Sequence, residues 1–453
     1  MVMLFTPALI VAQNFKLPEY SSFTLPNGLV VNLMEQHEVP VISVSVILPA
    51  GAIYDGDKAG LASLTADALM LGTKNYTKAQ LDEALGFVGA SVYASARKEF
   101  ASVNAKFAAK DKELVLNIIK EVLLEPTFEA SEFEKEKKRA LVAIERQKES
   151  PRSIIQSYFD QLVFKDHVYG NIAQGTAATL GNLEPSDVKD FYKRNYIPNG
   201  SAISIVGDFS IKEMKNRITK LLSGWKKSPV EKSDSASKPI DVPSEATVLL
   251  VNKEDAKETT FYIGSTGISR NDPEYVDIAI INTLFGGRFT SMLNDELRVN
   301  SGLTYGASSR FEPLKYGGSF TISTFTANET TEAAIDKALE VLKTLHSKGL
   351  DEKALASAKN YVKGQFPPKY ETVSQLSSLL GEMFWYGLDA SFINNFQNKV
   401  DALDLKKANE IIHTYFPKEN LQIVLIGKAS EIKPIAEKYG KVIETEINSY
   451  PKL

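Results

Sequence analysis

The chain has 453 residues, more than one ordinary hydrophobic core holds, so two or more domains are expected. Apolar residues make up 43% and charged residues 24% of the sequence, which is typical of a folded rather than a disordered chain. A net charge of −4 without a long basic run argues against a nucleic-acid partner. The absence of cysteine excludes disulfides, thiol nucleophiles and cysteine-ligated zinc.

Residues 1–19 open with a short apolar run, MVMLFTPALIVAQ, which has two interpretations. Its end at Val-Ala-Gln resembles a secretory signal before a cleavage site, which predicts a periplasmic or secreted protein. The basic residues expected before such a run are missing, so a buried first segment, with a cytoplasmic location, stays open. The run is shorter than the about 20 residues that cross a bilayer, so no membrane span is expected.

Residues 20–225 are predicted to form a first domain, because alternating β-branched residues indicate strands and apolar residues at helical spacing indicate helices. The expected strands are 29–36, 41–51, 90–97, 100–108 and 201–208. The expected helices are 60–72, 78–88, 110–126, 131–150 and 185–196. The fourth of these helices is expected to stop before Pro151.

Residues 246–453 repeat the same order of elements and are predicted to form a second, similar domain. The expected strands are 246–252, 259–268, 304–312, 317–326 and 421–428, and the expected helices are 273–285, 289–298, one from about 329, 351–368 and 404–416. Residues 226–245 are rich in Ser, Pro and Lys and are interpreted as a linker. Paired strands and clustered helices predict α+β domains, each with a largely antiparallel sheet and helices packed on one face.

The histidines give no sign of a metal site within this chain. The four of them are His37, His167, His346 and His413, and none lies within four residues of another. A zinc site on a helix needs two ligands one turn apart, so none can be built locally. The stretch FGGRF at 285–289 lacks the Lys-Ser/Thr that a phosphate-binding loop requires.

The stretch GGRFTSMLNDELRVNSGLTYGASS, from Gly286, is more informative. Gly286 and Gly287 are expected to break the chain before a helix that ends near Arg298. Tyr305 is expected at the start of the next strand, so the guanidinium and the phenol can converge. Together they can donate hydrogen bonds to a peptide carbonyl or an oxyanion. Without other information, a helix-end cation and a core tyrosine are the commoner explanation.

The whole chain, including its duplication, resembles the pitrilysin/insulinase family of zinc peptidases, in particular short members of the mitochondrial-processing-peptidase type. The family's first domain carries a helix of the form G-L-A-H-x-x-E-H, and GLASLTADAL at 60–69 resembles it. The second domain carries a Gly-rich loop, an Arg and R-G-L-x-Y, and LRVNSGLTYGASS resembles this motif and keeps both Arg298 and Tyr305.

The first motif departs from the family at every chemical position. The resemblance places the two zinc-binding histidines at Ser63 and Asp67, the general-base glutamate at Ala66, and the third ligand, a glutamate, at Ala143. A hydroxyl, a single carboxylate and two methyl groups cannot bind zinc tightly or accept a proton from water. The resemblance therefore implies a peptidase scaffold whose own zinc site is lost, with no cofactor bound to this chain.

Such chains in the family pair with a homologous subunit that keeps the zinc site, and the two enclose unfolded peptides. The resemblance thus implies a zinc-free subunit of a heterodimeric zinc endopeptidase. In it Arg298 and Tyr305 act in trans on the substrate, Gly286 and Gly287 contribute to substrate binding, and the zinc belongs to the partner. The alternative is a non-enzymatic peptide-binding or scaffold protein. An autonomous enzyme with another metal site is disfavoured by the scattered histidines.

Overall fold

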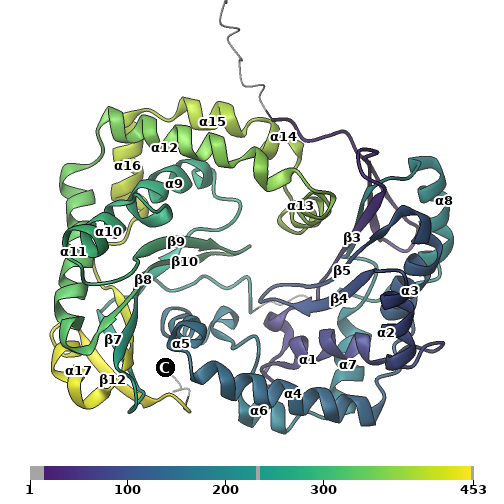
Figure 1. Ribbon diagram of the computed structural model, residues 1–453, viewed down its shortest axis with the longest axis horizontal. Coiled ribbons are helices and arrows are strands. Elements are labelled where there is room, and N and C mark those ends of the chain that lie inside the picture. Colours follow the sequence, from purple (N-terminus) through teal and green to yellow (C-terminus); the bar gives the residue numbers. More distant parts are fainter. Residues whose placement is uncertain (1–14, 231–234, 450–453) are drawn as a thin grey trace, which may run out of the picture.

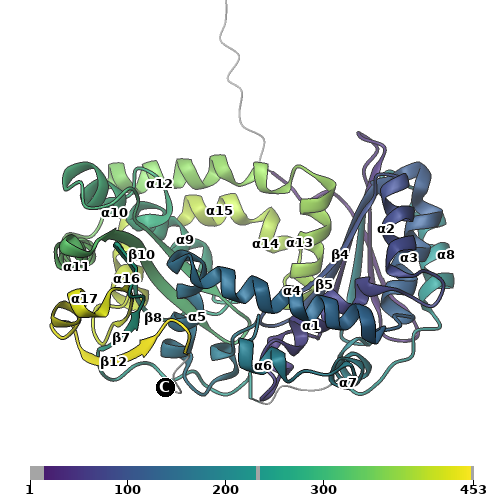
Figure 2. The same ribbon diagram turned by 60° about the horizontal axis from the view of Figure 1, so that its bottom comes forward.

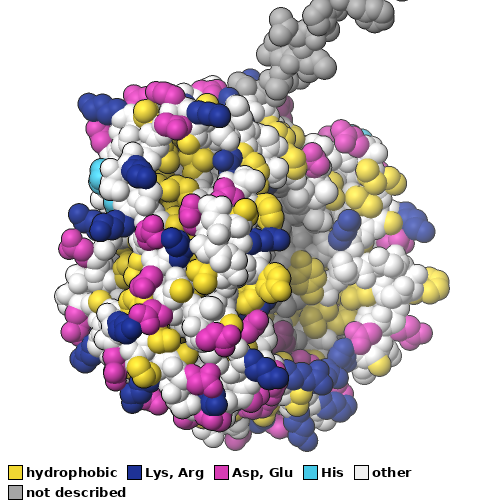
Figure 3. All heavy atoms as spheres, turned by 60° about the vertical axis from the view of Figure 1, so that its left-hand side comes forward, with side chains coloured by type: hydrophobic (Ala, Val, Ile, Leu, Met, Phe, Trp, Pro, Cys, Tyr) yellow, Lys and Arg dark blue, Asp and Glu magenta, His cyan; other side chains and the backbone are white. Residues whose placement is uncertain are grey.

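The computed structural model describes residues 15–230 and 235–449. The N-terminal run on which the signal interpretation depends, residues 1–13, therefore lies outside the described residues. The strands form two six-stranded sheets, one in each half of the chain, with helices around them (Figure 1). The space-filling view shows the surface hollowed between the two halves, with hydrophobic side chains exposed on the walls (Figure 3).

The first sheet has the order β1-β2-β6-β3-β5-β4, and its pairs are antiparallel except for β2 with β6. Its strands are β1 (Ser21–Thr24), β2 (Val30–Glu35), β3 (Val41–Leu48), β4 (Ser91–Ala96), β5 (Ala101–Ala108) and β6 (Ala202–Gly207). The helices of this half are α1 (Leu61–Ala68), α2 (Lys78–Phe87), α3 (Lys112–Leu124), α4 (Ala130–Lys148), α5 (Pro151–Phe164), α6 (Ala177–Gly181), α7 (Pro185–Asn195) and α8 (Ile211–Leu222).

The second sheet has the order β12-β7-β11-β8-β10-β9, in which β7 runs parallel to β11 and β12. Its strands are β7 (Thr247–Asn252), β8 (Glu258–Gly267), β9 (Ser308–Pro313), β10 (Gly318–Ala327), β11 (Gln422–Gly427) and β12 (Lys441–Glu446). The helices are α9 (Tyr275–Asn282), α10 (Met292–Asn294), α11 (Thr331–Lys348), α12 (Glu352–Gln365), α13 (Val373–Tyr386), α14 (Ala390–Asn394), α15 (Phe396–Ala402), α16 (Leu405–Tyr415) and α17 (Ala429–Ala436).

This architecture confirms the predicted α+β class with two similar, largely antiparallel sheets. The expected helix at 289–298 differs, because it is the short α10 followed by the π-helical segment η6 (Asp295–Asn300). The expected strand from 304 begins at Ser308, so Tyr305 lies in the preceding loop. The helix expected to stop before Pro151 does so, since α4 ends at Lys148, but Pro151 then begins a further helix, α5, at a position where its missing N–H costs nothing.

Each sheet is covered on its second face by one helix from the other half of the chain. Side chains alternate between the faces of a strand, and Ile42, Val44 and Val46 of β3 face the first domain's own core. Ser43, Ser45 and Ile47 face α13, which comes from the second half. Figures 1 and 2 show α13 beside the strands of the first sheet. Gly381 of α13 lets this helix approach Ile47, and Ser377 is hydrogen-bonded to Ser43 at 3.0 Å.

The reciprocal contact is made by α5, which comes from the first half and packs on β8 and β11. Leu249, Val251, Val424 and Ile426 of the second sheet cluster with the apolar face of α5, including Ile155, Tyr158 and Phe159. The alternate residues of the same strands, such as Val248 and Leu425, belong to the second domain's own core. Neither sheet would therefore be fully covered without the other half of the chain.

A buried carboxylate also joins the two halves. Glu99, in the turn between β4 and β5, is only 2% exposed. It accepts hydrogen bonds from the hydroxyls of Tyr169 and Tyr386 and, at 2.9 Å, from the backbone N–H of Lys315. Burial, and then the adjacent Glu99, raise the pKa of both phenols, which keeps them protonated as donors. Tyr169 belongs to the first half, while Lys315 and Tyr386 belong to the second.

The predicted linker is also partly packed. Ala236 lies in the cluster around α5, and its carbonyl is 3.2 Å from a ring nitrogen of His167. Across the described residues, no helix is both long enough and apolar enough to cross a bilayer.

The packing of α13 on the first sheet predicts that a side chain at Gly381 would destabilise the protein. A β-carbon at Gly381 would lie 2.8 Å from Cγ1 of Ile47, whereas one at Gly364 of α12 would meet open space. We expect Gly381→Val to lower the free energy of unfolding by about 1–3 kcal/mol, because α13 must move away from β3. Urea unfolding measures the change, with Gly364→Val as the matched control. Equal midpoints for the two variants would show that the contact does not constrain α13.

Candidate functional site

The helix that resembles the zinc-binding helix is α1, and its first turn is held by a buried carboxylate. Asp55 accepts the backbone N–H of Gly60 at 2.9 Å and of Ala62 at 2.7 Å. Gly60 has φ +93°, a conformation that strongly favours glycine, and a β-carbon there would collide with the backbone of Gly175. The backbone frame of this helix is therefore intact although its chemical groups have changed.

Ser63 and Asp67 are half-buried on α1, one turn apart, whereas Ala66 is fully buried. Ala143 is exposed on α4, which packs against α1. Within the described ranges, no group of three or more His, Asp or Glu side chains could hold a metal ion. The residues present do not fit a zinc ion, because only one carboxylate stands at the four positions.

The one carboxylate at these positions has an unusual environment. Burial, and then the negative charge of Glu136 on α4, raise the pKa of Asp67 to about 6. Glu136 lies seven residues before Ala143, about 10 Å along the helix axis, and is paired with Arg139 at 2.7 Å. The hydroxyl of the neighbouring, buried Tyr196 has no hydrogen-bond partner among the described residues. The contact between α1 and α4 is thus better described as helix packing around the poorly solvated Asp67 than as a catalytic centre.

In the second half, Arg298 lies in η6 with its side chain exposed. Its guanidinium carbon is 4.7 Å from the ring centroid of Phe289, a cation–π contact. Over the two described ranges, Arg298 makes no ion pair and no side-chain hydrogen bond. Its N–H groups are therefore available to a ligand.

Tyr305 is 82% exposed, so it is not a core tyrosine. The backbone on both sides of it is nevertheless fixed by buried threonines. The Thr326 hydroxyl donates to the carbonyl of Leu303 at 2.7 Å, and the Thr324 hydroxyl donates to the carbonyl of Gly306 at 2.9 Å. Thr304 accepts the N–H of Gly306 at 3.1 Å. The phenol is thus held out into solvent by an ordered loop.

Gly286 and Gly287 lie at the end of the π-helical segment η5 (Thr283–Gly287), before Phe289. Gly286 is buried, and a β-carbon there would lie 2.3 Å from Oγ of Ser309 on β9. Gly287 is exposed, and its β-carbon would be 3.0 Å from the carbonyl of Asn282. Close packing therefore accounts for Gly286, and its role in substrate binding stays a prediction.

The structure relates Arg298 and Tyr305 through a shared framework rather than through a direct bond. Asn294, whose side chain bonds the carbonyl of Phe289 and the N–H of Ala307, was not anticipated from the sequence, and neither were Phe289 and Glu136. The available signal for Phe289 was an aromatic residue two positions after the Gly286-Gly287 pair. The burial of Asn294 and the approach of Glu136 to Asp67 depend on tertiary packing and have no local sequence signature.

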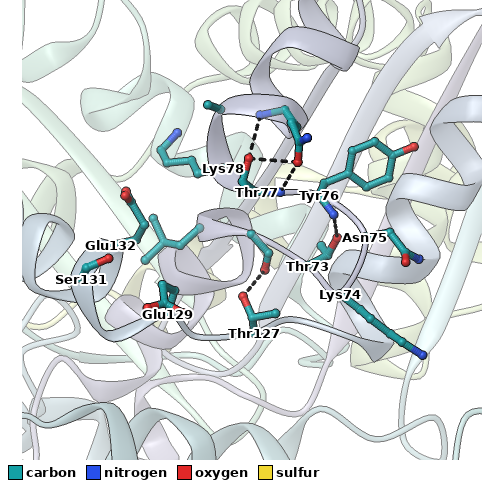
Figure 4. A pocket seen from close by; sticks show the side chains of 14 residues that line it. Thr73, Lys74, Asn75, Tyr76, Thr77, Lys78, Thr127, Glu129, Ser131 and Glu132 are labelled. Carbon is teal, nitrogen blue, oxygen red and sulfur yellow. Dashed lines mark hydrogen bonds between the residues drawn. The ribbon is translucent and has the colours of Figure 1, made fainter.

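A pocket of about 410 Å³ is lined by residues 71–80 and by Thr127, Glu129, Ser131 and Glu132 (Figure 4). None of the predicted site residues lines it. The hydrogen bonds across it are local: Thr77 and Gln80 cap α2, and the Thr127 hydroxyl donates to the carbonyl of Gly72. These polar groups satisfy turns and a helix end, so the pocket does not indicate a ligand.

The raised pKa of Asp67 makes a testable contribution to stability. Its folded-state pKa of about 6 exceeds the model-peptide value of 3.8, so folding favours the protonated acid. Stability should therefore fall as the pH rises from about 4 to 6, since the charged form is disfavoured in the folded state. We expect Asp67→Asn to raise the free energy of unfolding by roughly 1–3 kcal/mol at pH 8, with the gain shrinking towards pH 4.

Urea unfolding of the parent and of Asp67→Asn between pH 4.5 and pH 8 checks this expectation. Asp166→Asn, at an exposed carboxylate, is the control. A gain from Asp67→Asn that does not change with pH would show that the carboxyl ionises normally.

The four altered positions also predict that the purified chain holds no stoichiometric zinc after dialysis. The variant with Ser63→His and Asp67→His places two imidazoles one turn apart on α1, and adding Ala66→Glu and Ala143→Glu completes the family's set. We expect these variants to bind zinc more tightly than the unmodified chain, because the two imidazoles lie one turn apart on an intact helix. Elemental analysis of both proteins measures this. About one tightly held zinc per unmodified chain would contradict the conclusion that these four positions cannot bind zinc.

Comparison with known proteins agrees with this geometry. Residues 30–177 match insulinase (peptidase family M16), and residues 182–362 match the peptidase M16 inactive domain. An uncharacterized zinc protease, YmxG, of Bacillus subtilis is 21% identical over 411 residues, which cover 90% of this chain and 98% of the relative. A non-peptidase homolog, YmxG, of Helicobacter pylori is 22% identical over 414 residues, covering 88% and 94%.

Two solved structures share the fold. The structure described as a peptidase M16 inactive domain from Pseudomonas fluorescens has a TM-score of 0.84 and 24% identity, covering 90% of this chain and 98% of that one. A protease from Helicobacter pylori has a TM-score of 0.84 and 20% identity, covering 91% and 100%. With two adjoining matches between residues 30 and 362, this chain belongs to the insulinase family of peptidases, family M16, as a homologue of its inactive type.

Proposed function

We propose that this chain is a zinc-free subunit of a heterodimeric zinc endopeptidase that cleaves unfolded peptides. A homologous subunit with an intact H-x-x-E-H motif would hold the metal ion and its water. This chain would contribute Arg298 and Tyr305 to that site. The apolar N-terminal run supports a periplasmic or secreted location for the complex, which is part of the proposal.

The observation that carries the proposal is the state of the two side chains. Tyr305 is 82% exposed on a loop whose backbone is hydrogen-bonded on both sides. Arg298 is exposed and, among the described residues, has no acidic partner. A pure scaffold gains nothing from an exposed phenol and an unpaired guanidinium held in place, whereas a site that binds peptide backbone needs such donors.

The chemistry follows from what these groups can donate. The guanidinium offers several N–H groups in one plane and can bind a peptide carbonyl before and during the reaction. The phenol offers one O–H, which suits an oxyanion that develops as the carbonyl carbon becomes tetrahedral. Loss of all four zinc-site positions in the same chain fits this division of labour, because the partner supplies the base and the metal.

The proposal predicts different kinetic effects for the two residues. Tyr305→Phe removes one hydroxyl from an exposed ring, so fold and heterodimer should stay intact. It should lower kcat of the mixed complex by about 10²-fold, the usual scale for the loss of one oxyanion donor. Arg298→Ala should also raise KM, because it removes contacts made by the bound substrate.

The measurement is cleavage of a quenched fluorescent, unstructured peptide by each variant mixed with the H-x-x-E-H homologue of the same organism. The chain alone, with and without chelator, is the blank and should not cleave. Tyr316→Phe, at another exposed tyrosine, is the matched control. Full cleavage with both Arg298→Ala and Tyr305→Phe would make the non-enzymatic scaffold the better account.

A further inference from the structure

The exposed ring of Phe289 has no role in the core, yet its backbone is tightly held. The side chain is 67% exposed, which is unfavourable for a phenylalanine unless the ring has a partner. Among the described residues, the ring contacts the guanidinium of Arg298, whose central carbon lies 4.7 Å from the ring centroid. We propose that Phe289 is a positioning residue that holds Arg298 ready for substrate; this inference rests on the proposed function.

A cation–π contact suits this task better than an ion pair. The guanidinium carbon lies over the ring, and this contact uses no hydrogen-bond acceptor, so the N–H groups stay without a hydrogen-bond partner among the described residues. A carboxylate partner would instead bind these N–H groups and compete with a ligand. The orientation of Arg298 is thus restricted while its donors stay free for a carbonyl or carboxylate group of an extended peptide.

The neighbouring Arg288 shows the contrast. Its guanidinium donates to the carbonyl of Thr290 at 3.3 Å and to the hydroxyl of Ser357 at 3.0 Å. It also lies over the ring of Tyr361, 5.8 Å from the centroid. Arg288 therefore ties the loop to α12, with two of its guanidinium nitrogens in use. Of these two arginines, Arg298 is the one whose N–H groups are all available to bind a ligand.

Asn294 fixes the loop that carries Phe289. It is 4% exposed, and its Nδ2 donates to the carbonyl of Phe289 at 2.7 Å. Its Oδ1 accepts the backbone N–H of Ala307 at 3.3 Å, two residues after Tyr305. One buried amide, with one donor and one acceptor in use, therefore holds the loop of Phe289 and the loop of Tyr305 at a fixed separation.

The first experiment observes Arg298 directly in the chain alone. In protein labelled with ¹⁵N-arginine, the ring current of Phe289 should shift the Nε–H proton of Arg298 upfield, and Arg298→Lys assigns the signal by its loss. Phe289→Leu should return this proton to the position of exposed arginines. Phe87→Leu, at a 90% exposed phenylalanine ending α2, should leave it unchanged. An Arg298 signal that does not respond to Phe289→Leu overturns the proposal.

The second experiment asks whether the ring acts through Arg298. In the mixed complex, Phe289→Leu should raise KM for the quenched peptide about three- to fivefold, the scale of an exposed cation–π contact, with little change in kcat. On the Arg298→Ala background the same substitution should change nothing, since its effect is carried by the guanidinium. An equal loss on both backgrounds overturns the proposal, because the ring then touches substrate itself.

The two hypotheses fail in different ways. If Arg298→Ala impairs cleavage but Phe289→Leu does not, the positioning role is wrong and the proposed function stands. If Arg298→Ala leaves cleavage unchanged, the positioning role of Phe289 fails, and if Tyr305→Phe also leaves it unchanged, the proposed function fails as well. Thermal unfolding of each variant confirms that the comparison is made between folded proteins.

Discussion

Each of the two sheets has a second face that is covered by a helix supplied by the other half of the chain. α13 packs on β3 and β6, and α5 packs on β8 and β11. These two contacts join the halves by different means: α5 buries an apolar face of the second sheet, whereas α13 meets both Ile47 and buried serines of the first. The buried Glu99, bonded by groups from both halves, adds a directional constraint to that packing.

The duplication and the α+β class could be predicted because strand and helix periodicities recur in the same order. The two exchanged helices, 151–164 and 373–386, were missed. Pro151 correctly marked the end of α4, but it also occupies the first turn of α5, where proline is tolerated, and that second role was not anticipated. For α13 the periodicity of its apolar side chains was present in the sequence, but the sheet that this helix covers is about 170 or more residues away in the chain, and no local pattern reports it.

The two halves differ in which part of the family's site they keep. In the first, the backbone frame of α1 is kept by Asp55 and Gly60, while the chemical positions are filled by groups that cannot hold zinc. In the second, Arg298 is exposed on η6, and Tyr305 is exposed on a loop held by Asn294, Thr324 and Thr326. Arg298 and Tyr305 could be selected from the sequence by motif, but their exposure, and the ring beneath Arg298, depend on packing that only the folded chain shows.

The exchange of helices also determines the order in which the two halves can complete their folding during synthesis. Synthesis proceeds from the N-terminus, so the first sheet, complete once β6 has emerged, must wait for residues 373–386 before its second face is covered. During that interval Met34 and Val206, fully buried in the finished protein, have no partner helix. The nascent first half is therefore an aggregation-prone intermediate with exposed apolar side chains, and we expect chaperones to bind it until α13 has been synthesised.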